Sequence, residues 1–242
     1  LSGTKKEIAD TFYSNQKFEY NSKVNKWKTV FNPEHYKFKK ISEEIIDIKT
    51  NKVVVKAGTR TNFLHAQKLY NDGLKDIYVS NEAIYGRFLH NDISISSEEK
   101  ISIGTEITDE ILNKILEANI KTILISDTNS INKGPYLLKT LLADKNNLKD
   151  DSITDIYKIL RPGEPPTIEI ANQIFQNLFF GSERYDLSDV GRVKMNAKLN
   201  LNCSDKITIL RNEDIVAIIR HMLDLRDGKS EVDDIDHLGN RR

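Results

Sequence analysis

Cysteine and net charge are what this sequence most conspicuously lacks. Its 242 residues include one cysteine, Cys203, and 36 Lys and Arg balance 36 Asp and Glu. A lone cysteine excludes an intrachain disulfide and favours a reducing, intracellular compartment. The zero balance excludes a protein that binds nucleic acid through bulk positive charge, so any nucleic-acid contact must be local and sparse.

Long apolar runs are missing as well. No stretch approaches the ~20 apolar residues that span a bilayer, and the first twelve residues lack the apolar core of a signal peptide. We therefore expect a cytoplasmic protein with no membrane contact. The chain starts without Met and ends on Arg241 and Arg242 inside a charged segment, which predicts a piece of a longer chain.

Metal-binding and phosphate-loop motifs are also lacking. The five histidines show no His-x-x-His spacing, so the sequence predicts no zinc site. The pairs Gly58-Thr59 and Gly104-Thr105 lack the second glycine and the lysine of a phosphate-binding loop. Cys203 has no histidine near it in sequence, which favours an ordinary thiol over a nucleophile.

The first half of the chain has strand patterns and an internal repeat. A capping-box spacing at Thr4 and Glu7 predicts a short opening helix, and alternating apolar residues predict hairpins over 18–30 and 45–55. Residues 58–80 then recur at 104–126, an offset of 46, each copy running from a Gly-Thr turn through a helix into a strand. We interpret the copies as duplicated packing units that complete one core. A paired ligand site is the alternative.

The second half of the chain has helix signals. Ser152, Thr167 and Asn212 each stand where a cap would start a helix, and Gly163, Gly181 and Gly228 stand near the predicted ends. The apolar stripes of the second and third helices, with their Phe and Met residues, predict buried core. The sequence thus predicts an α+β fold with a strand-rich first part and a mainly helical second part.

Two segments between or after these helices carry chemistry. In the first, a stiff loop holds Arg161, and Arg184 with Tyr185 is followed by Arg192 and Lys194. Cations beside an aromatic ring suit a nucleic-acid single strand, through backbone charge and base stacking. Solvated charges tied to nearby acidic residues are the alternative interpretation.

The second segment, 231–242, carries Asp234 and Asp236. On a strand, this spacing would put both carboxylates on one face, as in pairs that hold Mg²⁺ for phosphoryl transfer, although the spacing is a weak signal. A carboxylate can also accept from the Watson–Crick edge of an unpaired guanine, while an arginine donates to the base or to phosphate.

Four strings in order give these segments a family resemblance. Residues 161–167 (RPGEPPT), 177–180 (NLFF), 184–194 (RYDLSDVGRVK) and 231–242 (EVDDIDHLGNRR) resemble the β subunit of bacterial DNA-dependent RNA polymerase. The resemblance is strong from Gly134 to Arg242. It implies a lineage-specific insertion at 1–133, the helical part of the β lobe at 134–230, and the start of the following β segment at 231–242.

The resemblance also implies a function. The chain would form the lobe wall of the DNA cleft in a nucleotidyltransferase, with Arg161, Arg184 and Tyr185 along the non-template strand, and Asp236 and Arg241 in a pocket for an unpaired guanine. The catalytic Mg²⁺ would be held by the β′ subunit, so this chain would hold no cofactor and be inactive alone. Its partners would be β′, α, σ and promoter and downstream DNA, at the bacterial nucleoid.

Two other functions compete with this one. The chain could be an accessory module whose insertion docks transcription regulators, with no essential DNA contact. It could also be a stand-alone Mg²⁺ phosphotransferase that uses Asp234 and Asp236, an alternative that the resemblance disfavours.

Overall fold

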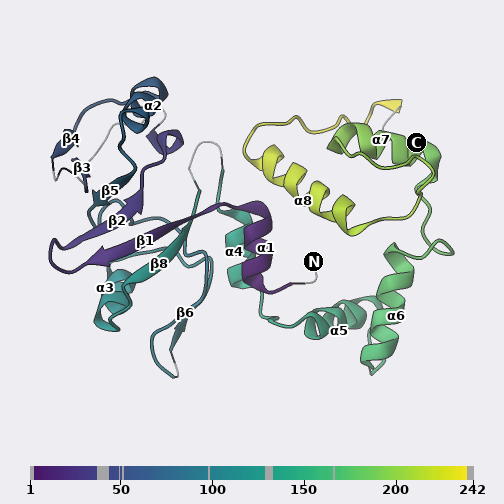
Figure 1. Cartoon of the computed structure of the whole chain (residues 1–242). Coiled ribbons are helices and arrows are strands. Elements are labelled where there is room, and N and C mark those ends of the chain that lie inside the picture. The colour runs from purple at the N-terminus through teal and green to yellow at the C-terminus, as the bar shows by residue number, and fades with distance from the viewer. Residues whose placement is uncertain are drawn as a thin grey trace. The chain divides into compact units, whose positions relative to one another are not determined.

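The computed structural model describes residues 3–36, 44–48, 50, 52–97, 99–128, 133–165 and 167–238, and has the predicted α+β composition (Figure 1). The chain divides into two compact units: a sheet unit, residues 13–128, and a helical unit, residues 1–12 with 129–242. In the described ranges no helix has the length and apolarity needed to cross a membrane. This division into compact units does not test the segment boundaries at 133/134 and 230/231 that the family resemblance implies, and these boundaries stay predictions.

The sheet unit is built on six antiparallel strands. Their spatial order is β4-β3-β5-β2-β1-β8, and β6 and β7 form a separate small hairpin. Both predicted hairpins are confirmed as β1–β2 and β3–β4. The bounds are Asn15–Asn21 (β1), Lys26–Val30 (β2), Ile45–Asp47 (β3), Val53–Val55 (β4), Asp76–Val79 (β5), Ile93–Ser94 (β6), Lys100–Ile101 (β7) and Thr122–Ser126 (β8), with a short 3-10 helix at Pro33–Tyr36.

The sequence repeat is also a structural repeat. Helix α2 spans Phe63–Asn71 and α3 spans Asp109–Glu117, so both ends differ by the predicted 46 residues. The Asn62 side chain accepts the His65 N–H at 2.8 Å, and the Thr108 hydroxyl accepts the Ile111 N–H at 3.4 Å, which caps the two helices in the same way.

Each copy ends in a strand that flanks the central hairpin. Ile77 of the first copy pairs with Thr29 of β2, and Ile123 of the second pairs with Phe18 of β1. Directly paired residues share a sheet face, and Thr29 pairs with Phe18, so Ile77 and Ile123 lie on the same face of the sheet. That face carries two adjoining apolar clusters, and Val79 packs against both.

The helical unit consists of helices that pack in pairs: α1 with α4, α5 with α6, and α7 with α8. The predicted capping box is confirmed, because the Thr4 N–H donates to Glu7 Oε2 at 2.7 Å and the Glu7 N–H to Thr4 Oγ1 at 3.3 Å. The bounds are Lys5–Phe12 (α1), Tyr136–Ala143 (α4), Lys149–Leu160 (α5), Ile168–Phe179 (α6), Ser188–Leu199 (α7) and Asn212–Arg226 (α8).

Three helix predictions in this unit were wrong. Asn212 does not cap the last helix, because it is the first residue of α8 and Arg211 stands at the N-cap position. Helix α5 starts at Lys149, and Ser152 is not its cap: its hydroxyl donates to the Leu148 carbonyl at 3.2 Å from within the first turn. Helix α7 lies in a charged segment for which the sequence predicted no helix. Its sequence gives no continuous apolar stripe, and Val190 and Val193 are exposed, so periodicity could not reveal it.

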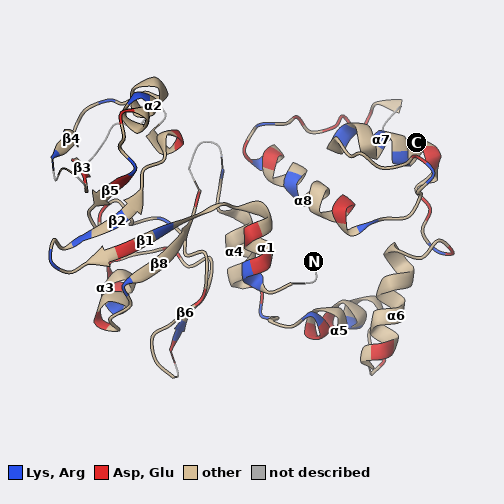
Figure 2. Cartoon of the chain, viewed as in Figure 1, with Lys and Arg blue, Asp and Glu red and all other residues tan. Residues whose placement is uncertain are grey.

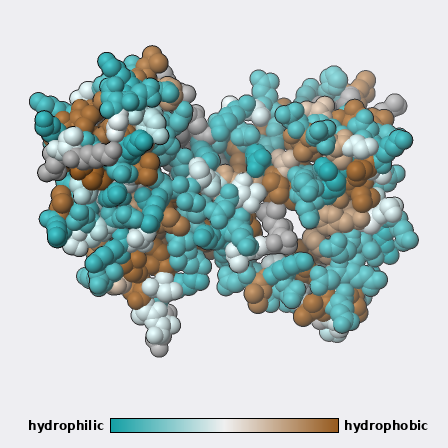
Figure 3. All heavy atoms as spheres, in the orientation of Figure 1, coloured by the Kyte–Doolittle hydropathy of each residue, from teal (hydrophilic) through white to brown (hydrophobic). Residues whose placement is uncertain are grey.

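Burial in α6 and α8 is also lower than predicted. Ala171 is the buried residue of α6, Ile168 and Ile170 are exposed, and Met222 of α8 is 58% exposed. A helix that packs mainly against one partner covers only part of its apolar stripe. Figure 3 shows the result as brown apolar surface among the hydrophilic surface of α5 and α6.

Candidate nucleic-acid interface

Arg161 stands where helix α5 ends. Its N–H donates to the Tyr157 carbonyl at 2.8 Å, and the chain then leaves the helix through Pro162 and Gly163. Gly163 has a φ of +93°, a conformation that residues with a Cβ rarely adopt. The turn at Pro162 and Gly163 therefore leaves Arg161 at the surface at the end of α5.

A carboxylate orients the Arg161 guanidinium. Glu164 Oε2 lies 3.4 Å from Arg161 Nη1 and accepts the Tyr157 hydroxyl at 2.9 Å. The Tyr157 hydrogen bond, followed by that of Arg161, lowers the pKa of Glu164, and the same bond to Glu164 raises the pKa of Tyr157. The Arg161 and Glu164 side chains are 51% and 56% exposed, so the guanidinium is restrained but accessible to a phosphate.

Arg184 and Tyr185 lie in the turn that follows helix α6. Their N–H groups donate to the Gly181 carbonyl at 3.2 and 3.0 Å. A Cβ at Gly181 would lie 3.0 Å from the Asn177 carbonyl oxygen, so this close turn favours glycine. The Arg184 side chain is exposed and Tyr185 is half-buried, as expected for a cation beside a partly supported ring.

Arg161 and Arg184 do not form one pocket, because helix α6 separates them. In the sequence, Arg161 precedes its first residue and Arg184 follows its last. Twelve helical residues span about 18 Å, so the two guanidinium groups are anchored at separate points. That spacing suits an extended polymer with repeated charges better than a small ligand.

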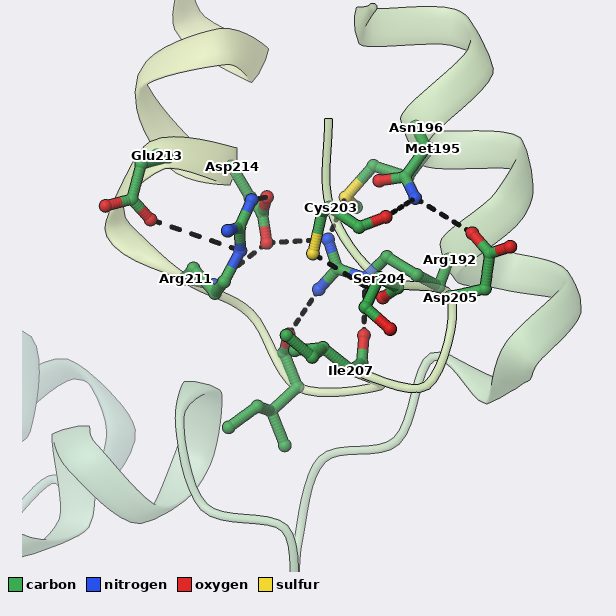
Figure 4. A network of polar contacts seen from close by, with 11 residues as sticks. Arg192, Met195, Asn196, Cys203, Ser204, Asp205, Ile207, Arg211, Glu213 and Asp214 are labelled. Carbon is green, nitrogen blue, oxygen red and sulfur yellow. Dashed lines mark hydrogen bonds and ion pairs between the residues drawn. The ribbon is translucent and has the colours of Figure 1, made fainter. Parts of the chain in front are cut away.

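Arg192, in contrast, is not a surface cation. Its side chain is fully buried, and its Nη1 lies 2.8 Å from Asp214 Oδ2, also fully buried (Figure 4). Its Nε donates to the Ile207 carbonyl at 2.5 Å, and its Nη2 donates to the Ile209 carbonyl. The prediction of Arg192 as a strand-gripping residue was therefore wrong, whereas Lys194 is exposed on α7.

Asp214 receives a second arginine at the start of α8. Arg211 donates to it from its backbone N–H at 2.9 Å and from its Nη2 at 3.0 Å. Burial raises the pKa of Asp214, but the hydrogen bonds from Arg211 and Arg192 outweigh burial and lower it. The carboxylate therefore stays charged inside the helical unit. Sequence reasoning missed this pair, because no motif links residues 22 positions apart.

The C-terminal segment differs from the prediction in one respect. Residues 231–234 form no strand in the structure, and 235–236 form a turn in which the Asp236 N–H donates to Asp234 Oδ1 at 2.9 Å. The prediction that Asp234 and Asp236 share one face of a strand was therefore wrong. Asp236 is exposed, and Arg241, its predicted partner in a guanine pocket, lies outside the described residues.

Other site types find little support in the parts of the chain that the structure describes. They contain no group of three or more His, Cys, Asp or Glu arranged to hold a metal ion. A groove of about 560 Å³ lies between α7 and α8, but none of the predicted site residues lines it. Acidic and basic residues are interspersed along α8 (Figure 2), without a continuous basic track.

Comparisons with known proteins give consistent matches. The sequence profile described as "RNA polymerase Rpb2, domain 2" matches residues 102–242. The DNA-directed RNA polymerase subunit beta of Rhizobium leguminosarum bv. trifolii (strain WSM2304) is 44% identical over 238 residues, 98% of this chain and 17% of that subunit. Those of Rickettsia canadensis (strain McKiel) and Rickettsia felis (strain ATCC VR-1525 / URRWXCal2) are each 42% identical over 234 residues, 93% of this chain and 17% of the subunit.

These matches confirm the resemblance that the four sequence strings indicated. The profile covers more than half of the chain, and the chain spans 17% of the length of these curated relatives. The chain belongs to the RNA polymerase Rpb2 domain 2 family, and its homologues identify it as a segment of the polymerase β subunit.

Proposed function

We propose that this segment forms a wall of the DNA cleft in the β lobe of a DNA-directed RNA polymerase and contacts the non-template strand of the transcription bubble. Arg161 and Arg184 bind backbone phosphates, and Tyr185 offers a ring face to an unstacked base. The observation that carries the proposal is the placement of two accessible guanidinium groups at opposite ends of helix α6.

The neutral charge of the chain fits this role within an assembly. With 36 basic and 36 acidic residues the segment cannot hold DNA by its own field. Its partners would be the β′, α and σ subunits and promoter and downstream DNA. The assembly would supply the nucleotidyltransferase activity and hold the catalytic Mg²⁺ on β′. Alone, the segment would be inactive.

Substitution of Arg161 tests the backbone contact. In the whole polymerase we expect Arg161→Ala to shorten the lifetime of the promoter open complex. Loss of one single-strand phosphate contact should also reduce the slope of log K against log salt by about 0.7. The matched control is Arg60→Ala, which removes an exposed arginine from the sheet unit. An unchanged salt slope for Arg161→Ala would contradict a phosphate contact.

Substitution of Asp236 tests base recognition. A carboxylate accepts from the ring and amino N–H groups of guanine, and no other base offers that pair of donors on its Watson–Crick edge. In the whole polymerase, Asp236→Ala should therefore abolish the preference for a non-template guanine at the downstream edge of the bubble. Open-complex lifetimes on promoters with each base at that position measure the preference. Retention of the guanine preference would refute the role of Asp236.

A second candidate function is docking of transcription regulators on the sheet unit. The observation that favours it is a set of exposed apolar side chains on α2 and β4, namely Leu64, Tyr70 and Val53. Apolar side chains that a unit leaves exposed are available for contact with a protein partner. Removal of the sheet unit tests docking, because it should abolish the binding of a regulator while promoter melting persists.

A further inference from the structure

The buried pair of Arg192 and Asp214 is connected to the loop that carries Arg184 and Tyr185. The Arg192 guanidinium donates to Asp214 and, through its other nitrogens, to the carbonyls of Ile207 and Ile209 (Figure 4). These carbonyls belong to the segment between α7 and α8. One buried side chain therefore holds the carbonyls of Ile207 and Ile209 and connects their segment to Asp214 of α8.

Thr208 lies between the two carbonyls that Arg192 holds. Its own carbonyl accepts the Leu187 N–H at 2.8 Å. Leu187 is two residues beyond Tyr185 and directly precedes α7. Because the guanidinium fixes the backbone on both sides of Thr208, the hydrogen bond from Leu187 anchors the exposed loop to the buried pair.

A different anchor holds the other side of the same loop. The Gly181 carbonyl, after the last residue of α6, accepts the N–H groups of Arg184 and Tyr185. The dipeptide is thus bracketed, by Gly181 on the α6 side and by Leu187 on the α7 side. Only the second anchor depends on Arg192 and Asp214.

We propose that Arg192 and Asp214 are positioning residues, which hold the Arg184–Tyr185 loop in the conformation that receives single-stranded nucleic acid. This inference rests on the proposed function of that loop. A loop ordered before binding loses less conformational entropy when it binds. An arginine suits the role, because its planar fork can donate to a carboxylate and two carbonyls together, which a lysine cannot do with the same geometry.

Amide hydrogen exchange in the whole polymerase tests the anchor directly. Asp214→Asn keeps the shape of the side chain and removes its charge. We expect the Leu187 amide to exchange at least about tenfold faster, while the amides of α5 keep their rates. The matched control is Asp205→Asn, an exposed acid on the same segment that accepts from Asn196 at 3.1 Å. An unchanged Leu187 rate in Asp214→Asn would overturn the anchor.

A double-mutant cycle tests whether the anchor acts through Arg184. Asp214→Asn should shorten the open-complex lifetime in the wild-type background and shorten it by a smaller factor in an Arg184→Ala background, where only the Tyr185 contact remains to be lost. Equal shortening in both backgrounds would overturn the positioning role. If Arg184→Ala by itself leaves the lifetime unchanged, the proposed function of the loop fails, and the Leu187 exchange rate still reports whether the anchor exists.

A second variant covers the case in which Asp214→Asn does not fold. Leu187 has a φ of −77°, which is within the range that proline requires, and Leu187→Pro removes the donor to the Thr208 carbonyl. We expect it to shorten the open-complex lifetime as Arg184→Ala does, with the Arg192–Asp214 pair retained. A wild-type lifetime in Leu187→Pro would overturn the proposal.

Discussion

Arg161 and Arg192 have the same side chain and opposite surroundings. Arg161 is half-exposed and paired with one accessible carboxylate, Glu164, whereas Arg192 is fully buried with its donors directed to Asp214 and backbone carbonyls. An exposed pair contributes about 0–1 kcal/mol, but removal of one partner from a buried pair costs about 3–5 kcal/mol. Arg161 is therefore available for a ligand, and Arg192 is committed to the fold.

Glu164 provides a prediction at the residue scale. Its negative charge both orients Arg161 and repels a phosphate that approaches the same guanidinium. Glu164→Gln should therefore lengthen the open-complex lifetime, by no more than about fivefold, because exposed charge pairs contribute at most about 1 kcal/mol. Tyr157→Phe is the control, since it removes the hydrogen bond at 2.9 Å and keeps the carboxylate. A shorter lifetime in Glu164→Gln would mean that orientation outweighs repulsion.

At the scale of elements, the two repeat copies differ in how their helices end. Gly73 follows α2 with a φ of +107°, and Asn119 follows α3 with a φ of +57°. Asparagine tolerates the left-handed region, but the Gly73 conformation lies further from what a residue with a Cβ adopts. The two copies thus form the turn after the helix with different residues, and only the turn of the first copy requires glycine.

A pair of substitutions at these positions checks that difference. Gly73→Ala should lower the free energy of unfolding of the sheet unit by about 1 kcal/mol from backbone strain alone, because open space surrounds the new Cβ. Asn119→Gly should change it by less than about 0.5 kcal/mol. Urea denaturation followed by the fluorescence of Trp27, the single tryptophan and fully buried in this unit, measures both. Equal effects would contradict the strain argument.

At the scale of the whole molecule, the first and last residues of the sheet unit lie side by side. Asn15 of β1 pairs with Ser126 of β8, and the Asp127 N–H donates to the Ser14 carbonyl at 2.8 Å. Paired strands bring their Cα atoms to about 5 Å. Helix α1, which precedes this unit, packs with α4, which follows it. The unit is therefore attached like an insertion, whose two ends a short linker can join.

Replacement of residues 13–128 by a short Gly-Ser linker tests the role of the sheet unit in the whole polymerase. All the residues proposed to contact DNA lie in the helical unit, so promoter melting should persist with less than about a threefold change in open-complex lifetime. The control carries the same linker between Phe12 and Tyr13 without a deletion. Persistence of melting together with lost binding of a regulator would support docking. Loss of melting would refute an accessory role for the unit.

Much of the fold and part of the candidate site could be predicted from the sequence. The opening capping box and both hairpins are local patterns that backbone geometry imposes over short stretches of chain, and the repeat is visible as self-similarity at an offset of 46 residues. The accessible positions of Arg161 and Arg184 also follow local signals, because each stands in a Pro- or Gly-containing turn after a helix.

Tertiary structure alone decided burial and long-range pairing. Arg192 and Arg184 are both arginines in one charged string, yet the segment of residues 203–211 encloses the first and leaves the second exposed. Asp214 became its partner across 22 positions. The apolar stripes of α6 and α8 predicted more burial than pairwise helix packing provides. Local sequence sets the backbone of each element, but the energy of a charge depends on which distant segments exclude water from it.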